Sequence, residues 1–285
     1  MNNSFIKAGV IGHPLKHSKS PIIHNHWIKQ HHLNGEYTAI DIAPGALENG
    51  IQDLIDQGFA GFNVTLPHKQ TIMNLCETID DTAKIIGAVN TVSIKGGKLH
   101  GQNTDAFGFI QNIAQQQPNF DFTNGAALVL GAGGAARAVI YGLIDAGATA
   151  ITITNRTAEK AKEIANDLSD FAALKSCNIN VLDWGLRDQK EHVQNLHLLV
   201  NTTSLGMDGK PALDYNIAHL PDDALVNDIV YAPLYTDLLT DAERRGLKTV
   251  TGIGMLLHQA RPAFNAWFGV MPDVDDLLQQ KLLDA

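Results

Sequence analysis

The sequence predicts an α/β protein with two domains, and three observations carry this prediction. Apolar runs typical of strands alternate with helix-like stretches along most of the chain, a pattern that builds mainly parallel sheets covered by helices. A glycine-rich turn at 131–136 separates an apolar run at 126–130 from a helical stretch. The 285 residues suffice for two cores of ordinary size. We therefore predict a Rossmann-type, doubly wound parallel sheet and a second α/β domain with a mainly parallel sheet.

The first hundred residues are expected to contain strand–helix pairs followed by a hairpin. A helix at 105–117 then leads into the glycine-turn region. Gly96-Gly97 predicts the hairpin turn, because paired glycines adopt the positive φ values that a tight turn requires. The strands are expected at 5–11, 36–41 and 61–65, the helices at 21–33, 46–57 and 67–76, and the hairpin at 88–95 and 98–101.

The alternation continues through the second half of the chain. Gly246 closes one predicted helix at a C′ position. Pro262 lies inside another, where it should kink the helix or mark a late start. The expected elements are strands at 126–130, 197–201 and 224–229, a β-rich run ending at 155–157, and helices ending near 168 and at 236–245, 255–268 and 274–283.

Composition and charge exclude several classes of function. A hydrophobic content of 45% and a charged content of 18% are typical of a globular protein. The net charge of -9 argues against nucleic-acid binding. No apolar run approaches the roughly 18 residues of a membrane span, and the first residues lack the pattern of a signal peptide. We therefore expect a cytoplasmic protein. These features leave its oligomeric state open between a monomer and a homodimer, and the net charge does not exclude a small anionic molecule as partner.

Cysteine and histidine positions do not predict a metal site. Cys76 and Cys177 lie far apart and form no CxxC pair, so we expect reduced thiols. His24 and His26 are two positions apart and would point in different directions on a helix. We expect these histidines on solvated faces and no bound metal.

The turn after residue 130 predicts a cofactor site. Gly131 allows the turn, Gly133 lets the backbone approach a pyrophosphate, and the helix that follows offers free N–H groups and a positive dipole end. A plain turn is the alternative reading. The residues expected to contact the cofactor here are Gly131, Ala132, Gly133, Gly134 and Ala135.

The end of the next strand favours NADP over NAD. A site for NAD usually carries Asp or Glu about 20 residues after the glycines, but Asn155, Arg156 and Thr157 stand here. A guanidinium can pair with a 2′-phosphate through two hydrogen bonds and stack on adenine. An ordinary surface arginine is the alternative.

Four polar segments are predicted to follow or end strands, at 17–21, 63–69, 87–91 and 103–108. Ligands bind at the carboxyl edge of such sheets. The segments supply hydroxyls, amides, one cation and one carboxylate, which suit a small polyol.

Three of these segments carry residues with alternative roles. Ser18 and Ser20 precede Pro21 and could cap a helix or hold a carboxylate. Lys69 is expected in the first turn of a helix, where a cation opposes the dipole and its neutral form is favoured. Asp105 starts another helix and could be an N-cap or a partner of Lys69.

These segments, taken with further motifs, resemble the shikimate dehydrogenase family in order and spacing over nearly the whole chain. The resemblance implies NADP-dependent, reversible reduction of 3-dehydroshikimate to shikimate in the synthesis of chorismate and the aromatic amino acids. The motifs that carry it, beside those above, are Asn201-Thr202-Thr203-Ser204-x-Gly206-Met207, Asp228-x-x-Tyr231-x-Pro233 and Gly252-x-Gly254-Met255-Leu256-x-x-Gln259.

The resemblance also implies roles for individual residues. Lys69 and Asp105 would be the catalytic pair, and Ser18 and Ser20 would hold the substrate carboxylate. The remaining substrate residues would be Thr65, Asn90, Tyr231 and Gln259, with Lys69 and Asp105 contributing as well. Thr203, Ser204, Gly252 and Met255 would join the cofactor residues.

The resemblance further implies a discontinuous substrate-binding domain of residues 1–103 and 255–285, with an NADP-binding domain of residues 104–254 inserted and catalysis in a cleft between the two. His13 and the Ala260-Arg261-Pro262 stretch depart from the usual family pattern, which leaves the placement of Gln259 open. The alternatives are a quinate/shikimate dehydrogenase that uses NAD, a non-catalytic sensor of shikimate-like acids and, least favoured, a structural protein without a ligand.

Overall fold

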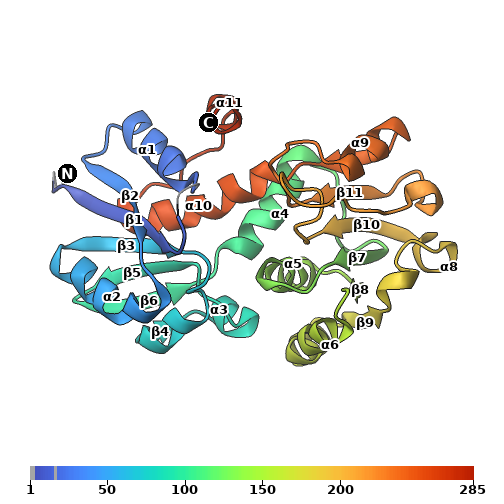
Figure 1. Ribbon diagram of the computed structural model, residues 1–285, viewed down its shortest axis with the longest axis horizontal. Coiled ribbons are helices and arrows are strands. Elements are labelled where there is room, and N and C mark those ends of the chain that lie inside the picture. The colour runs from blue at the N-terminus through green and yellow to red at the C-terminus, as the bar shows by residue number, and fades with distance from the viewer. Residues whose placement is uncertain (1–3, 16–17) are drawn as a thin grey trace. The chain divides into compact units, whose positions relative to one another are not determined.

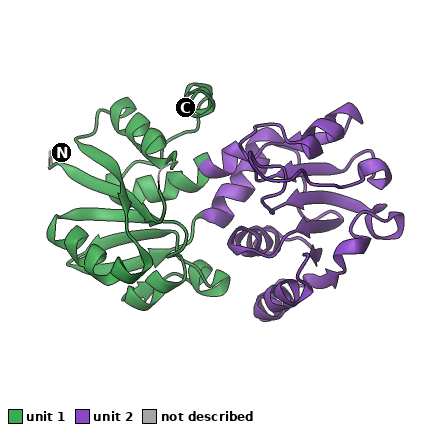
Figure 2. Cartoon of the chain, viewed as in Figure 1, with its two compact units in different colours: residues 1–104, 257–285 green, residues 105–256 purple. Residues whose placement is uncertain are grey.

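The computed structural model describes residues 4–15 and 18–285, and the chain forms two compact units (Figures 1 and 2). Unit 1 comprises residues 1–104 and 257–285, and unit 2 comprises residues 105–256. The chain enters unit 2 at the start of helix α4 (Asp105–Gln116) and returns to unit 1 within helix α10 (Ile253–Phe268). Unit 1 is therefore discontinuous in sequence. Across the described residues, no helix is both long and apolar enough to cross a membrane.

Unit 1 is built on a mixed sheet in which one strand opposes the others. Its described strands have the order β2-β1-β3-β5-β6-β4. β1 pairs in parallel with β2 and β3, whereas β5 pairs antiparallel with both β3 and β6. The strands are β1 (Ile6–Gly12), β2 (Gly35–Asp41), β3 (Phe59–Val64), β4 (Thr78–Ile79), β5 (Thr91–Lys95) and β6 (Lys98–Gln102). Gly96 and Gly97 have φ values of 59° and 76°, as the predicted hairpin requires.

The helices of unit 1 come from both ends of the chain. Pro262 lies inside α10, which begins at Ile253, so the proline does not mark a late helix start. The helices are α1 (Ser20–Gln30), α2 (Leu47–Asp56), α3 (Asp81–Ile86) and α11 (Asp276–Leu283), with short 3₁₀ turns η1 (Pro44–Ala46) and η2 (Thr71–Leu75).

The predicted helix at 67–76 is wrong. Residues 67–70 form turns, and only η2 follows. The reason is tertiary, because the Lys69 carbonyl accepts the backbone N–H of Val89 at 2.8 Å and thus pairs outside its own segment. The prediction that Lys69 lies at an α-helix start therefore fails, and the dipole argument for its neutral form loses its basis.

The sequence analysis also missed helix α3, although the signals were present. The Asp80 carboxylate accepts the backbone N–H of Ala83 at 2.7 Å as an N-cap, and Gly87 closes the helix with a φ of 74°. An Asp at the N-cap and a Gly just after the last helical residue are recognised signals for the start and the end of a helix.

An aromatic cluster joins α1, β2 and the end of α10 in unit 1. The rings of His24 and Tyr37 stack with centroids 4.0 Å apart, and Trp27, Phe264 and Trp267 surround His24. His24 is fully buried, so the expectation of a solvated histidine is wrong at this position. Burial without a charged partner favours the neutral ring and lowers the pKa of His24 to about 3.

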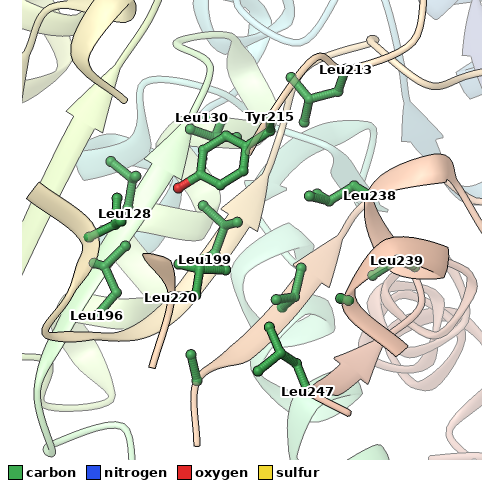
Figure 3. Close-up of a cluster of buried hydrophobic side chains, with 14 residues drawn as sticks. Leu128, Leu130, Leu196, Leu199, Leu213, Tyr215, Leu220, Leu238, Leu239 and Leu247 are labelled. Atoms are coloured by element: carbon green, nitrogen blue, oxygen red, sulfur yellow. The ribbon is translucent and has the colours of Figure 1, made fainter. Parts of the chain in front are cut away.

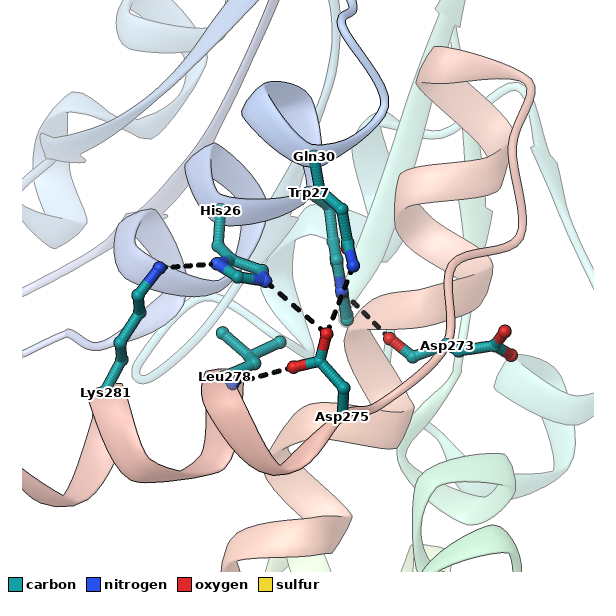
Figure 4. A network of polar contacts seen from close by, with 7 residues as sticks. All are labelled: His26, Trp27, Gln30, Asp273, Asp275, Leu278 and Lys281. Carbon is teal, nitrogen blue, oxygen red and sulfur yellow. Dashed lines mark hydrogen bonds and ion pairs between the residues drawn. The ribbon is translucent and has the colours of Figure 1, made fainter.

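The C-terminal helix α11 is fastened to α1 by polar contacts (Figure 4). Asp275 caps α11 and also accepts from Gln30 of α1, while Lys281 lies 2.9 Å from the His26 ring. Lys19, which precedes α1, donates to the carbonyl of Leu282 at 2.7 Å. The last residues of the chain thus hold the start of α1 in place.

Unit 2 contains a parallel sheet with the order β12-β11-β10-β7-β8-β9, and every pairing among its described strands is parallel. The chain starts at the centre, runs outward to β9, and then returns through β10 to the other edge, which is the doubly wound Rossmann order. The strands are β7 (Ala126–Leu130), β8 (Ala150–Thr154), β9 (Asn178–Leu182), β10 (Leu196–Asn201), β11 (Leu225–Asp228) and β12 (Lys248–Val250).

Leucines from strands and helices pack together in unit 2 (Figure 3). Leu128, Leu130 and Leu199 come from β7 and β10, and Leu238 and Leu239 come from α9. Burying one leucine fully stabilises the fold by about 1.5–3 kcal/mol, so this cluster fixes the central strands. The remaining helices of unit 2 are α5 (Gly134–Asp145), α6 (Ala158–Asp167), α7 (Ser169–Leu174), α8 (Lys190–Val193) and α9 (Asp237–Arg244), with 3₁₀ turns η3 (Trp184–Leu186) and η4 (Ile217–His219).

Candidate active site

The polar segments of unit 1 meet at one edge of its sheet. β1, β3 and β6 run in one direction and end at this edge, and β5 runs against them and starts there. The segment at 87–91 therefore precedes its strand, contrary to the expectation that each segment follows or ends one. The antiparallel direction of β5 is what brings Asn90 to the same edge as Thr65 and Thr104.

Asn90 is held from several sides. Its Oδ1 accepts the backbone N–H of Thr104 at 2.9 Å and the hydroxyl of Thr91 at 3.0 Å. Its Nδ2 donates to Thr104 Oγ1 at 3.0 Å and to Gln259 Oε1 at 3.4 Å. Because the backbone N–H of Thr104 can only donate, the amide of the buried Asn90 turns Oδ1 toward Thr104 and Nδ2 toward Gln259.

Two predicted substrate residues thus lie together although they are 169 positions apart. The Asn90–Gln259 bond is the longest in this set, and a ligand hydroxyl could bind between a donor and an acceptor of this kind. Gln259 lies on α10, which continues through Pro262, and the doubt over its placement is resolved in favour of a position beside Asn90.

Ser18 and Ser20 do not cap α1. The N-cap position is Lys19, and no side chain accepts from the first N–H groups of this helix. Pro21 has no N–H, and the N–H groups of Ile22 and Ile23 both donate to the Lys19 carbonyl, at 3.1 and 3.4 Å. The two serine hydroxyls are therefore the candidate carboxylate ligands here, and these three residues do not supply the free N–H donors that the sequence analysis expected. His17, which belongs to the same polar segment, lies outside the described residues.

Thr65 and Lys69 stand just beyond β3. The backbone N–H of Thr65 donates to Ile11 at 2.9 Å, which continues the pairing with β1. A Cβ on Gly12 would approach Thr65 Cγ2 to 2.5 Å, so Gly12 makes room for this side chain. Lys69 belongs to unit 1 and Asp105 to unit 2, and their action as a pair stays a prediction.

Sequence reasoning missed the buried residues that order this edge. Tyr37 donates to Asn63 Oδ1 at 2.7 Å, and Asn63 Nδ2 donates to Thr91 Oγ1 at 3.1 Å. Asn63 and Thr104 lay within the predicted polar segments and could have been found there. Tyr37 lies inside β2 and gave no signal.

The glycine turn of unit 2 has the features of an anion site. Gly131 has a φ of 112°, and a Cβ there would lie 2.6 Å from Thr202 Oγ1, so only glycine fits. At Gly133 and Gly134, by contrast, a Cβ would meet nothing within 4 Å. Gly133 is the N-cap of α5 and provides no side-chain cap, which leaves the helix N–H groups available for a phosphate. These residues fit a dinucleotide.

Asn155, Arg156 and Thr157 lie between β8 and α6. The Asn155 amide donates to the Thr157 carbonyl at 2.9 Å, which shapes the turn. Thr157 is the N-cap of α6 but makes no side-chain cap bond, and Arg156 is exposed beside it. An exposed guanidinium next to an uncapped helix start suits a phosphate group.

Thr203 and Ser204 follow β10 in a loop that buried side chains hold. Asn201 Oδ1 accepts both the backbone N–H and the hydroxyl of Thr203, at 3.0 and 2.7 Å. Asn201 Nδ2 donates to the Asp228 carboxylate at 3.0 Å, and Thr236 donates to the same group at 2.8 Å, so Asp228 couples the loops after β10 and β11. Burial raises the pKa of Asp228. Tyr231 lies in the second of these loops.

Gly252 has a packing reason to be glycine. A Cβ there would lie 2.4 Å from the backbone of Ile229. The Gly252 carbonyl accepts the N–H of Met255 at 3.1 Å, which forms a tight turn at the start of α10. Contact of Gly252 and Met255 with a cofactor stays a prediction.

Within the described ranges, no group of three or more His, Cys, Asp and Glu side chains could hold a metal ion. Cys76 and Cys177 are both free thiols.

Comparison with known proteins gives matches along the whole chain. Family models described as the shikimate dehydrogenase substrate binding domain, shikimate / quinate 5-dehydrogenase, and the shikimate 5'-dehydrogenase C-terminal domain match residues 10–92, 112–204 and 252–280. The chain is 47% identical, over 97% of its length and 97% of the relative, to shikimate dehydrogenase (NADP(+)) of Paramagnetospirillum magneticum.

Solved structures agree with these matches. Shikimate 5-dehydrogenase of Thermus thermophilus, in complex with NADP(H) and shikimate, has a TM-score of 0.83, 33% identity and 98% coverage of both chains. Quinate dehydrogenase of Corynebacterium glutamicum, in complex with NAD, has a TM-score of 0.89 at 29% identity, covering 99% of this chain and 100% of that one. Matches of this identity and extent show that the chain belongs to the shikimate dehydrogenase family.

Proposed function

We propose that this protein is an NADP-dependent shikimate dehydrogenase that reversibly reduces 3-dehydroshikimate to shikimate in aromatic amino-acid (chorismate) biosynthesis. The observation that carries the proposal is the edge of unit 1, where Asn90 and Gln259 present an amide donor and an amide acceptor together. The names of the close relatives support the same reaction. In this proposal, unit 1 binds the substrate and unit 2 binds NADP.

The substrate would be held by groups of different chemistry. Ser18 and Ser20, at the start of α1, would bind its carboxylate through their hydroxyl donors. Thr65, Asn90 and Gln259 would bind its ring hydroxyls, because each offers uncharged donors or acceptors. We also assign Tyr231 to the substrate, near the carboxylate.

Lys69 and Asp105 would act as the catalytic pair. NADPH, when bound, supplies the hydride that reduces the ring ketone. The Lys69 ammonium donates a proton to the developing alkoxide oxygen, and neutral Lys69 accepts that proton in the reverse direction. Asp105 orients the ammonium and favours its charged form.

The cofactor would bind along the carboxyl edge of the unit 2 sheet. The N–H groups at the start of α5 would bind the pyrophosphate at the turn formed by residues 131–135. Asn155, Arg156 and Thr157 would bind the 2′-phosphate, which NAD lacks. Thr203, Ser204, Gly252 and Met255 would contact the nicotinamide end.

The deciding experiment measures NADPH or NADH formation with shikimate and quinate, each combined with NADP and NAD. We expect turnover to be fastest with shikimate and NADP. Turnover only with quinate and NAD would favour the activity of the Corynebacterium neighbour instead. Binding of shikimate without turnover in any combination would indicate a sensor.

The proposal includes a cytoplasmic location and a monomer or homodimer. Cell fractionation and sedimentation of the purified protein test these two points directly.

A further inference from the structure

We propose that Tyr37 is a positioning residue for substrate binding, because its hydroxyl starts a one-way chain of hydrogen bonds that ends at the Asn90 amide. The inference rests on the proposed function, in which Asn90 binds a substrate hydroxyl. Tyr37 lies within β2 and is only 1% exposed, so it acts through other residues rather than by contact with the ligand.

The chain of bonds has a single direction. Tyr37 has one hydroxyl proton and donates it to Asn63 Oδ1 at 2.7 Å. The Asn63 amide must then present Nδ2 to the other side, where it donates to Thr91 Oγ1 at 3.1 Å. Thr91 therefore uses its own proton to donate to Asn90 Oδ1 at 3.0 Å.

Backbone groups agree with this direction at both ends. Asn63 Nδ2 also donates to the Asn90 carbonyl at 3.2 Å, which can only accept. Asn90 Oδ1 also accepts the backbone N–H of Thr104 at 2.9 Å, which can only donate. If one amide turned over, two donors or two acceptors would face each other inside the protein.

Burial makes this direction costly to change. Tyr37, Asn63, Thr91 and Asn90 are 1%, 6%, 0% and 2% exposed, so water cannot replace a lost partner easily. The stacked His24 ring at 4.0 Å holds the Tyr37 ring in place. The consequence at the site is that Asn90 offers Nδ2, a donor, beside the acceptor oxygen of Gln259.

Tyr37→Phe removes the oxygen that starts this series of hydrogen bonds, which is also the oxygen beside Ser20. We expect the KM for shikimate to rise about three- to tenfold, because one buried acceptor loses its donor and the Asn90 amide is held less firmly. We expect the KM for NADP and kcat to stay close to the wild-type values.

The matched control is Tyr215→Phe in unit 2. Tyr215 is also buried, and its hydroxyl donates to the Arg187 carbonyl at 3.1 Å. This variant loses a comparable hydrogen bond but should leave the KM for shikimate unchanged. An equal change in both variants would show a general effect on stability and would overturn the proposal.

A double-mutant cycle tests the route. In an Asn90→Ala background, Tyr37→Phe should have no further effect on the KM for shikimate. In a Ser20→Ala background, its effect should persist. The opposite pattern would show that Tyr37 acts through Ser20, which lies beside the same phenol oxygen, and would contradict the proposed series of hydrogen bonds.

A substitution at Thr91 is a second, independent way to interrupt this series of hydrogen bonds. Thr91→Val keeps the shape but removes the hydroxyl and should reproduce the KM shift even if Tyr37→Phe fails to fold, whereas Thr91→Ser should restore most of the affinity. Calorimetric titration with shikimate reads affinity without turnover. A wild type that binds shikimate but does not oxidise it would contradict the proposed function alone, and unchanged affinity in the Tyr37 and Thr91 variants would contradict this inference alone.

Discussion

Unit 1 and unit 2 present polar groups at their sheet edges by opposite means. In unit 1, the groups are side chains such as Asn90 and Gln259, and Asn90 is held by the buried Thr104, 14 positions away, and by Gln259, 169 positions away. In unit 2, the groups at the glycine turn are backbone N–H donors, and the site depends on side chains that are absent at Gly133 and Gly134. A site made of side chains is disturbed when one of their hydrogen-bond partners is removed. A site made of backbone N–H groups is disturbed mainly by a substitution that adds a side chain.

The largest effect is expected for Lys69, the cation to which we assign proton transfer. Lys69→Ala is expected to lower kcat by about 10²–10⁴-fold, because a positioned acid or base contributes a factor of that size. The KM for shikimate should change little. Steady-state kinetics with shikimate and NADP measure both constants.

Lys84→Ala is the control for this variant, since Lys84 is an exposed lysine of unit 1 that pairs with Asp81. It should keep full activity. A Lys69→Ala enzyme with most of its turnover would rule out the proposed proton transfer.

The next largest effect should come from adding a side chain to unit 2. Gly133→Asp has room for its Cβ and creates a preferred N-cap, so the free energy of unfolding should stay equal or rise slightly. The added carboxylate would occupy the anion site, and we expect NADPH affinity to fall about a hundredfold, on the scale of a like-charge contact of a few kcal/mol. Fluorescence titration with NADPH and thermal melting separate the two effects.

Gly131→Ala, in contrast to Gly133→Asp, should lower the stability of the fold. Its Cβ would clash with Thr202 at a positive φ, so the variant should melt at a lower temperature.

If Gly133→Asp bound NADPH normally, the pyrophosphate assignment would be wrong.

A smaller effect is expected at the phosphate clamp of unit 2, formed by Asn155, Arg156 and Thr157. Arg156→Ala should weaken NADPH binding about tenfold, because Arg156 is exposed and water reduces the contribution of its charge-assisted hydrogen bonds to about 1.4 kcal/mol in total. NADH binding should not change, since NADH lacks the 2′-phosphate. Parallel titrations with the two cofactors measure the difference.

Arg244→Ala, at an exposed arginine paired with Asp241 in the same unit, serves as the control and should bind both cofactors normally. Equal losses of NADPH and NADH affinity in the Arg156 variant would argue against 2′-phosphate recognition.

The last effect concerns the stability of unit 1 and its pH dependence, and it should leave ligand binding and turnover at neutral pH almost unchanged. His24 takes up a proton near pH 6.5 in the unfolded chain, but burial lowers its pKa to about 3 in the fold. The unfolded state therefore binds more protons as the pH falls, so stability that is complete above pH 6.5 is lost progressively toward pH 3. Between pH 6.5 and 5 this loss amounts to about 1.7 kcal/mol for one proton.

His24→Leu should remove this part of the acid sensitivity, although it lowers stability at neutral pH. Urea unfolding at several pH values measures the slope. His31→Leu, at an exposed histidine just after α1, should keep the wild-type slope. Equal slopes for the His24 variant and the wild type would contradict the buried, neutral state of His24.

The contrast between the units also explains what could be predicted from sequence. The Rossmann order and the glycine turn were predictable because their determinants are local, and Gly131 shows this in its φ of 112°. The family resemblance added residues such as Gln259, which no local pattern would have joined to Asn90.

Other features depend on tertiary contacts. The false helix at 67–76 had acceptable local propensity, but the Lys69 carbonyl pairs with Val89 instead. Tyr37 gave no signal, because an apolar-looking strand position does not reveal a hydrogen bond to a residue 26 positions away. Strand β9 was missed because it is only five residues long and lies at an edge of the sheet, where none of its residues is fully buried.

The discontinuous unit 1 has a consequence for synthesis on the ribosome. Residues 105–256 must be translated before α11 and the part of α10 that contains Trp267 emerge. Unit 1 needs these helices, because Trp267 donates to the Val92 carbonyl at 3.0 Å within its core. At about 5–20 residues per second, the nascent N-terminal segment waits roughly 8–30 s for these partners. Unit 2 is complete in sequence first, so the inserted unit can fold while the surrounding one still lacks its closing helices.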